Sequence, residues 1–332
     1  MRAARLVAPG DPPTFDVVDV TTPEPGEGEV AVDLEAAALN RRDWWIWRNP
    51  DTPVPVTLGS DGAGLVGAVG PGVTGLEVGQ EVVIDATLEW GDSEEAGGEQ
   101  FDILGSPTEG TFAERVIVPA GNVAPKPSRL SFEEAAALNL GGLTAWRAAV
   151  TCARVGEGRT LLVTGAGSGV STFVIQIAVE LGTRVVVTSG SQAKIDRAIE
   201  LGAIGGCLYT DEEWPDNAMA LAGGPFDAAV DSFGAGVWAG ALRALRRGGR
   251  LVSFGDTGGP DVTIPLHEVY WEWRSVIGTT MGSPSEFRAL LAHVEAASWK
   301  PVIDSVYGLN EIAAAAARLT EPDRFGKVVV TP

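Results

Sequence analysis

The chain has 332 residues, which exceeds the size at which one hydrophobic core usually stops growing, so we expect two domains. Its 24 basic residues against 44 acidic residues give a formal net charge of −20, which argues against nucleic acid or an anionic membrane surface as a partner. The only cysteines are Cys152 and Cys207, so a disulfide framework or a cysteine-rich metal site cannot be built.

The N-terminal residues contain no apolar stretch long enough for a signal peptide. No run of about eighteen apolar residues, the length needed to span a bilayer, occurs in the chain. We therefore expect a cytoplasmic protein.

Residues 1–124 make up the first predicted domain. Short apolar runs punctuated by Gly and Pro indicate strands over 28–34, 62–69, 79–84 and 112–118. Strands at this spacing predict a compact β-rich domain with partial barrel character. No dinucleotide-binding fingerprint occurs in this part of the chain.

Residues 125–299 make up the second predicted domain, because the pattern becomes helical after Pro127 and a capping box joins Ser131 to Glu134. Strand-like runs then alternate with amphipathic helical stretches; these runs lie over 161–164, 184–188, 207–209, 227–231 and 250–254. Such alternation predicts βαβ units and a parallel, doubly wound sheet, so the fold class is α/β.

The end of the chain predicts helices over 284–297 and 310–318 and a last strand over 326–331. This strand could rejoin the β-rich domain. The first domain would then be completed by about residues 300–332.

A glycine-rich turn is the strongest local signal. The strand over 161–164 runs through Gly165, Gly167 and Gly169 into a helix that begins near Val170. Glycines let the backbone approach a pyrophosphate, and the helix N-terminus offers free amides. Ser171 stands where the third glycine of the fingerprint normally lies, which predicts slightly wider helix–strand packing. The strand before and the helix after the turn predict a Rossmann cofactor site rather than a mere tight turn.

The end of the next strand predicts the choice of cofactor. Thr188, Ser189 and Gly190 stand where an NAD-specific site would place an acidic residue for the ribose hydroxyls. Ser189 and Ser191 can donate hydrogen bonds to a 2′-phosphate, and Lys194 can supply positive charge. NADPH is therefore favoured over NADH. The alternative for Lys194 is a solvated helix residue without this role.

With this turn in place, the whole chain resembles the medium-chain dehydrogenase/reductase superfamily. The landmarks occur in order at residues 39–43, 58–64, 69–73, 110–114, 134–136 and 143–145. The resemblance implies a GroES-like catalytic domain, a Rossmann domain with strand order 3-2-1-4-5-6, and an active site in the cleft between them.

The chain departs from the zinc-dependent members of that superfamily. Asn40 stands where they carry a zinc-binding Cys, and Gly59-Ser60-Asp61 replaces Gly-His-Glu. Neither His267 nor His293 lies in this region, so we expect no metal. The acidic segment 89–104 resembles in position a lobe that carries four structural-zinc cysteines in many relatives, but it has none. We expect it to be a poorly ordered acidic loop.

Asn40-Arg-Arg-Asp43 is similar to the Asn-x-x-Asp pattern of zinc-free quinone oxidoreductases. The resemblance implies that Asn40 lies close to the nicotinamide ribose and that Asp43 helps to shape the site. Gly190, Lys194 and Tyr209 would hold the 2′-phosphate. The other cofactor positions are Thr144, Gly165, Gly167, Ser168, Gly169, Val170, Ser189, Phe233, Gly255 and Lys327. The alternative for Asn40 and Asp43 is a structural turn, which Asx residues favour.

The expected reaction follows from the absence of a Lewis acid, which is the main stabiliser of an alkoxide that develops on an isolated carbonyl. A quinone or enone spreads the charge, so hydride delivery needs chiefly positioning and a few hydrogen bonds. Candidates for the proton donor are Asp43, Asp61 or an ordered water. Trp44, Trp45 and Trp47 could line the pocket of a planar substrate, although packing in the core or an interface explains them equally well.

Two further functions remain open. One is a metal-independent carbonyl reductase or alcohol dehydrogenase, and the other is a non-catalytic NADPH-binding protein. Residues 274–280 are predicted to form the edge strand of the Rossmann sheet. Relatives commonly pair such an edge across a twofold axis, so we expect a homodimer.

Overall fold

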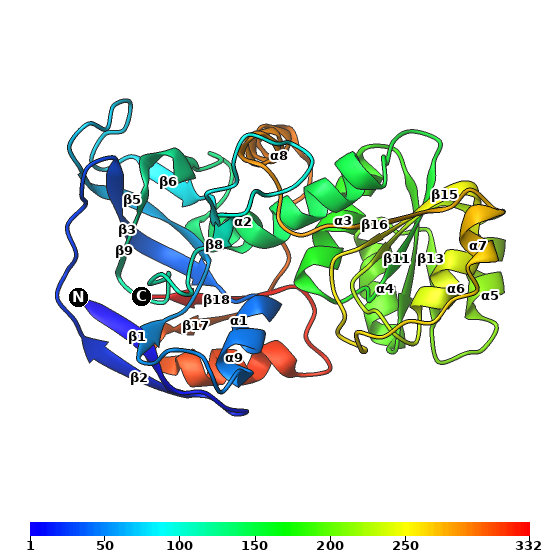
Figure 1. Cartoon of the computed structure of the whole chain (residues 1–332), viewed down its shortest axis with the longest axis horizontal. Coiled ribbons are helices and arrows are strands. Elements are labelled where there is room, and N and C mark those ends of the chain that lie inside the picture. Colours follow the sequence, from blue (N-terminus) through cyan, green and yellow to red (C-terminus); the bar gives the residue numbers. More distant parts are fainter. The chain divides into compact units, whose positions relative to one another are not determined.

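The computed structural model describes residues 1–332, which divide into two compact units (Figure 1). Unit 1 comprises residues 1–143 and 282–332, and unit 2 comprises residues 144–281. The first division falls inside helix α2 (Phe132–Trp146), because the beginning of that helix packs on unit 1, where Asn139 Nδ2 donates to the carbonyl of Gly62 at 2.8 Å. The limits thus differ from the predicted ones, which were 124/125 and 299/300.

Unit 1 is built on a seven-stranded sheet in the order β10-β6-β5-β3-β18-β17, with β9 pairing to β3. The bounds are β3 (Glu29–Ala38), β5 (Asp61–Val69), β6 (Glu81–Ile84), β9 (Arg115–Pro119), β10 (Val123–Pro125), β17 (Ile303–Gly308) and β18 (Lys327–Thr331). A smaller sheet joins β2 (Thr14–Asp19), β1 (Arg2–Ala8) and β4 (Val56–Thr57). The C-terminal strand β18 therefore lies inside the sheet of the N-terminal strands (Figure 1).

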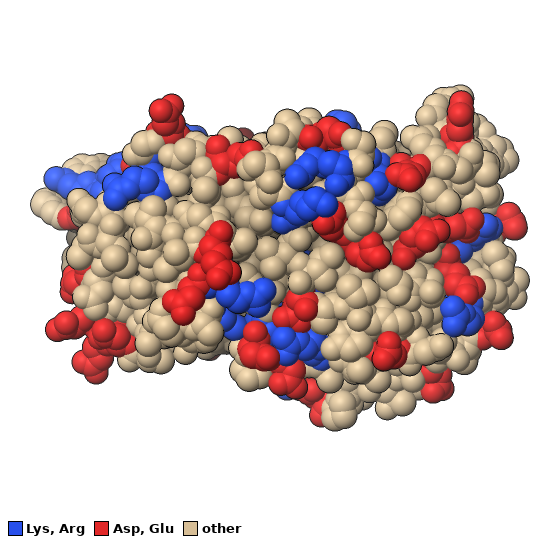
Figure 2. Space-filling model, turned by 180° about the vertical axis from the view of Figure 1, so that it is seen from behind, with Lys and Arg blue, Asp and Glu red and all other residues tan.

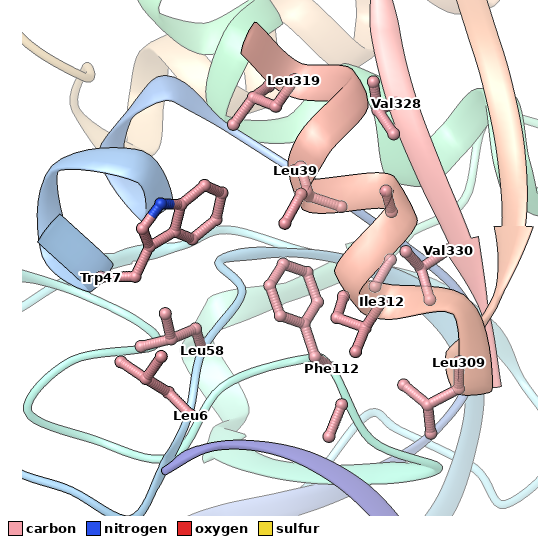
Figure 3. Packing of buried hydrophobic residues seen from close by; sticks show 14 of the residues in the cluster. Leu6, Leu39, Trp47, Leu58, Phe112, Leu309, Ile312, Leu319, Val328 and Val330 are labelled. Atoms are coloured by element: carbon pink, nitrogen blue, oxygen red, sulfur yellow. The ribbon is translucent and has the colours of Figure 1, made fainter. Parts of the chain in front are cut away.

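Two helices close one core of unit 1, namely α1 (Arg41–Arg48) and α9 (Ile312–Thr320). Helix α9 buries Ile312, Ala315, Ala316 and Leu319, which is the spacing of one helix face. Figure 3 shows this face beside Trp47 of α1 and the side chains it packs with; the labelled members are Leu6, Leu39, Leu58, Phe112, Leu309, Ile312, Leu319, Val328 and Val330. The unit also contains α8 (Pro284–Ala296) and the short 3-10 helices η1 (Ala120–Asn122) and η3 (Leu309–Glu311).

Unit 2 is a six-stranded parallel sheet in the order β13-β12-β11-β14-β15-β16 (Figure 1). The strands are β11 (Thr160–Thr164), β12 (Arg184–Ser189), β13 (Gly205–Leu208), β14 (Phe226–Asp231), β15 (Leu245–Ser253) and β16 (Ser275–Gly278). In order of succession this is 3-2-1-4-5-6, so the expected doubly wound topology is confirmed. The inner strands are almost wholly buried, as a sheet covered on both faces requires.

The helices of unit 2 connect these strands and include one irregular segment. They are α3 (Gly169–Glu180), α4 (Gln192–Glu200), α5 (Trp214–Ala222), α6 (Trp238–Arg243) and α7 (His267–Tyr270). Helix α2 runs into a π-helix, η2 (Arg147–Cys152). No helix of the structure is both long enough and apolar enough to span a membrane.

Several elements differ from the sequence expectations; strands β1, β2 and β17, for example, were not among the expected strands. Strand β13 begins at Gly205 rather than 207, and β15 begins at Leu245 rather than 250. The early part of β15 is polar and pairs with β14 across an irregular register, so its apolar pattern does not mark it as a strand. Helix α1 is a further difference, because no helix was expected over the segment Arg41–Arg48.

The surface reflects the acidic composition of the chain. On the face drawn in Figure 2, acidic side chains are spread over the whole surface, and basic side chains form short groups among them. With 44 acidic and 24 basic residues, such a surface carries a net negative potential.

Candidate active site

A buried polar cluster in unit 1 joins three segments that are distant in the sequence. Asn40 precedes α1, Asp61 begins β5 and Lys327 begins β18. Lys327 Nζ lies 2.6 Å from Asn40 Oδ1 and 2.8 Å from Asp61 Oδ2. Asn40 Nδ2 donates to the same Asp61 oxygen at 2.9 Å. The structure therefore brings together two residues that the sequence proposed for catalysis and one that it proposed for the cofactor.

Asp61 is the common acceptor of this cluster. Its Oδ1 accepts from the backbone N–H of Leu140 in α2 at 2.7 Å, while Oδ2 serves Asn40 and Lys327. A carboxylate without solvent contact needs such donors, because burying an unpaired charge is very costly.

Lys327 is only 3% exposed, which bears on its expected role as a cofactor ligand. Its ammonium group is already engaged by Asn40 and Asp61 inside unit 1. These surroundings favour an internal role for Lys327 over direct contact with a phosphate group of the cofactor.

Asp43 has the structural part that the turn alternative assigned to it. Its Oδ2 accepts from the backbone N–H of Asn40 at 2.7 Å, which satisfies an amide at the start of α1. The Asn40 side chain takes part in the capping box at the start of α1 and is also hydrogen-bonded to Asp61 and Lys327. The turn alternative thus describes Asp43 but does not account for the bonds of Asn40 to Asp61 and Lys327.

The pKa of Asp43 is raised from 3.8 to about 6, chiefly because the carboxyl is fully buried. Asp61 adds to this rise, whereas the hydrogen bond from Asn40 and the positive charges of Arg42 and Lys327 oppose it. The Oδ1 atom of Asp43 has no hydrogen-bond partner. Asp43 is therefore a carboxyl that can exchange a proton in the neutral range.

The residues at the zinc-ligand positions do not fit zinc. Asn40, Ser60 and Asp61 offer amide, hydroxyl and carboxylate oxygens, whereas zinc sites in proteins are built mainly from Cys, His and carboxylate ligands. An ammonium group also lies within 3 Å of two of these side chains. No group of three or more His, Cys, Asp or Glu residues could hold a metal ion anywhere in the structure. We derive no reaction step through zinc.

The three tryptophans of α1 have different surroundings. Trp47 is 1% exposed and belongs to the hydrophobic core, so the packing alternative holds for it and it is withdrawn from the substrate pocket (Figure 3). The guanidinium groups of Arg41 and Arg48 both lie over the Trp44 ring, at 4.1 and 4.3 Å from its centroid. Trp45 is 47% exposed and remains available for a flat ligand.

The structure bears out the strand–turn–helix setting of the glycine-rich segment in unit 2. Gly165 has a φ of 71°, a left-handed conformation that glycine adopts without strain. Ser168 caps α3, because its hydroxyl accepts from the backbone N–H of Ser171 at 3.0 Å. The Ser171 hydroxyl reaches back to the carbonyl of Thr164 in β11 at 3.4 Å. Ser171 thus bridges the helix and the strand where a glycine would only pack.

The residues expected to bind the 2′-phosphate have close neighbours among the glycines of unit 2. A methyl group added to Gly167 would come within 2.6 Å of Lys194 Cδ, and one added to Gly190 within 2.6 Å of Tyr209 Oη. The rings of Tyr209 and Phe233 lie 5.0 Å apart. Lys194 therefore lies beside the glycine-rich turn, and Tyr209 lies beside Gly190.

The remaining proposed cofactor positions are also within unit 2. Ser189 ends β12 and Val170 lies in the first turn of α3. Gly255 follows β15 close to the Ser232 backbone, and Thr144 lies near the end of α2.

Sequence reasoning missed a buried network at the carboxyl ends of β11 and β14. Asp231 Oδ1 accepts from Thr164 Oγ1 at 2.5 Å, and its Oδ2 accepts from Ser253 Oγ at 3.3 Å. Burial raises the pKa of Asp231, although these hydrogen bonds and those from the backbone of Phe233 and Gly234 oppose the rise. An acidic residue that ends an apolar strand, at the edge where parallel sheets bind ligands, was the available signal.

The acidic segment 89–104 is held in place, contrary to the expected disorder. Trp90 is buried, and its ring meets Phe101 edge-on at 5.3 Å. Glu94 Oε2 accepts from the hydroxyls of Ser283 and Ser285 at 2.5 and 2.7 Å. The short strands β7 (Thr87–Leu88) and β8 (Asp102–Ile103) pair at its base. Aromatic packing and hydrogen bonds thus hold a lobe that lacks cysteines.

Two family models match the chain. The alcohol dehydrogenase GroES-like domain matches residues 26–128, and the zinc-binding dehydrogenase model matches residues 169–296. They fall on the β-rich part of unit 1 and on a segment that begins at α3 and ends at α8.

Relatives with similar sequences or structures carry different names. The zinc-type alcohol dehydrogenase-like protein YogA of Leptosphaeria maculans is 34% identical, over 94% of this chain and 92% of its own. A quinone oxidoreductase of Salmonella typhimurium is 32% identical, over 77% of this chain and 73% of its own. The crystal structure of an NAD-dependent alcohol dehydrogenase superposes with a TM-score of 0.94 at 42% identity, covering both chains completely.

The buried Asp43 carboxyl predicts a specific pH dependence of stability. Its pKa of about 6 in the folded state lies above the ordinary value of 3.8, so the folded chain binds the proton more tightly. Stability from this group is therefore present below about pH 4 and is lost as the pH rises to about 6, by up to roughly 3 kcal/mol. Asp43→Asn keeps an oxygen for the helix cap and should raise the free energy of unfolding at pH 8 by roughly 1–3 kcal/mol.

Urea unfolding of both proteins between pH 4 and pH 8 measures this effect, with the difference shrinking toward pH 4. Asp51→Asn, which changes an exposed aspartate nearby, is the control and should leave the profile unchanged. A loss of stability at pH 8 in Asp43→Asn would show that the buried carboxylate itself is needed for the fold.

Proposed function

The chain belongs to the medium-chain dehydrogenase/reductase superfamily, and from this premise we propose that it is a zinc-independent NADPH oxidoreductase whose acceptor is a quinone or an α,β-unsaturated carbonyl. The observation that carries the proposal is the cluster of Asn40, Asp61 and Lys327, which provides polarity and hydrogen bonds without zinc ligands. The quinone oxidoreductase among its relatives supports the choice of acceptor.

The cofactor would be held by unit 2. The amides at the start of α3 and the turn at Gly165 and Gly167 would receive the pyrophosphate, and Lys194 with Tyr209 would receive the 2′-phosphate. When bound, NADPH supplies the hydride. The superposed NAD-dependent alcohol dehydrogenase makes NAD the competing choice, but no carboxylate follows β12 to bind the ribose hydroxyls.

The residues of unit 1 would position the acceptor and supply the proton. We propose that Asn40 contacts the nicotinamide ribose and that Trp44 and Trp45 border the planar substrate. Asp43, whose pKa is raised to about 6, would supply the proton, and Asp61 keeps Asn40 in place. Hydride and proton together reduce the conjugated acceptor by two electrons. Positioning of this kind lowers the barrier without a metal.

A metal-independent alcohol dehydrogenase or carbonyl reductase is the second candidate, because relatives carry alcohol dehydrogenase names. The third is a protein that binds NADPH without catalysis. Neither of them has an observation in the cluster that favours it over the conjugated acceptor.

The acceptor test separates these three functions. With 4-deuterated NADPH, the purified chain should transfer deuterium to a small quinone or enone and should react poorly with aliphatic ketones and alcohols. Tight NADPH binding without consumption by any conjugated acceptor would favour the binding protein, and faster turnover of simple ketones would favour the second candidate.

The metal test is separate. Elemental analysis should find no stoichiometric zinc, and a chelator should leave turnover unchanged.

The cofactor test uses the lysine above the glycine-rich turn. Wild-type protein should bind NADPH more tightly than NADH, and Lys194→Ala should narrow the difference by roughly 1–2 kcal/mol, the range for losing one charge-assisted contact. NADH binding to the same variant is the internal control and should change little. Equal affinities of the wild type for both cofactors would refute NADPH preference.

We also propose that two copies pair through β16. This strand ends the sheet of unit 2, and its outer edge has no partner strand. Apolar side chains are exposed on and beside it; they are Leu266, Tyr270, Trp271, Trp273 and Val276. An open strand edge can pair with its own copy about a twofold axis, and apolar side chains beside it gain by being covered.

Sedimentation measures this proposed dimer. Wild-type chain should sediment at twice the mass of 34.5 kDa, and Val276→Lys should shift the equilibrium toward the monomer. Ile199→Lys alters an equally exposed apolar residue of α4 and should keep the dimer. A monomeric wild type would refute the proposal.

A further inference from the structure

The lysine at the start of β18 is a buried cation without an assigned role in the proposed reaction. Lys327 belongs to the C-terminal strand, yet its ammonium donates to Asn40 and Asp61 in the N-terminal part of unit 1. Its distances to the two acceptor oxygens are 2.6 and 2.8 Å. An ammonium in this position restricts the geometry of both acceptors.

The ammonium determines which way the Asn40 side-chain amide faces. An ammonium group has three donors and no acceptor, so the atom of Asn40 beside it must be the carbonyl oxygen. The amide nitrogen then faces Asp61, which as a carboxylate can only accept. Donor and acceptor partners on opposite sides exclude the flipped amide. One of the two Nδ2 hydrogens is bonded to Asp61, and the other has no protein partner among the hydrogen bonds of this cluster.

Stability alone does not account for this arrangement. A buried ion pair is often no more stabilising than well-packed apolar residues of similar size, because both charges lose their water. The start of α1 does not require it either, since Asp43 supplies the capping hydrogen bond. The arrangement does fix an amide whose remaining N–H can donate to a ligand oxygen.

We infer that Lys327 is a positioning residue of the active site, which acts by holding the Asn40 amide in the one orientation that presents its free N–H to the reacting end of the cofactor and acceptor. The inference rests on the proposed function. The lysine places its ammonium group directly beside Asn40 and Asp61.

Chemical rescue tests this role. Lys327→Ala removes three carbons and the amine, a fragment that n-propylamine matches. The variant should lose about 100-fold in kcat, the cost of a small misplacement at the reacting centre, while KM for NADPH changes less than about threefold. Added n-propylamine should restore at least about a tenth of the lost turnover. 1-Propanol, which has the same size without the charge, should restore none.

Two further variants separate positioning from folding. Lys126→Ala removes another buried lysine of unit 1, which pairs with Glu81 at 3.1 Å and donates to the carbonyl of Leu130 but has no bond to Asn40. The Lys126→Ala variant should have a lower melting temperature, yet its kcat should stay within about twofold of the wild type. Added n-propylamine should not change that kcat. Lys327→Arg retains the charge and should keep more turnover than Lys327→Ala.

The inference is overturned if Lys327→Ala retains wild-type turnover, or if its loss is matched by Lys126→Ala. It is also overturned if propylamine restores the melting temperature but not kcat, since the lysine would then be structural only. Should the wild type itself reduce no conjugated acceptor, the proposed function fails, and the emission of bound NADPH becomes the readout. Lys327→Ala should then alter that emission and propylamine should restore it; unchanged emission overturns the inference.

Discussion

The charge of Asp61 is the constraint around which unit 1 is arranged. A carboxylate removed from water must be met by donors, and the chain brings them from three elements: the N-terminus of α1, the middle of α2 and the first residue of β18. Each donor arrives only if its element is in place. The same interactions that make burial of the charge tolerable therefore fix the position of Asn40.

Unit 2 also contains a buried carboxylate that is surrounded by hydrogen-bond donors. Asp231 ends β14 and binds hydroxyls of β11 and β15 together with the amides of the following loop. This ties three adjacent strands together at the edge where the glycine-rich turn begins. Ser171 and Ser232 continue the network beneath the turn through the carbonyl of Thr164. In both units, a buried carboxylate thus links several neighbouring elements through hydrogen bonds.

Local patterns predicted the parts of the molecule that local physics determines. The glycine-rich turn and the alternation of strands and helices follow from residues close in sequence, whereas the grouping of Gly190, Lys194 and Tyr209 was expected only from the resemblance to the superfamily. The pairing of Lys327 with Asp61 joins positions 266 residues apart, and no pattern in either segment announces it. The different burial of Trp45 and Trp47 depends on which face of α1 each occupies. Because this helix was not expected from the sequence, only the structure distinguishes the exposed ring from the buried one.

The place of β18 in the sheet has a consequence for synthesis on the ribosome. Unit 2 is one continuous stretch, and all of it has emerged before the chain ends. Strand β3 can pair with β5 and β9 earlier, but its pairs with β18 can form only near the end of translation. Folding domain by domain usually proceeds from the N-terminus. Here the sheet of unit 1 is completed only after all of unit 2 has been translated, and Lys327 is the last hydrogen-bond partner of Asp61 to be synthesised.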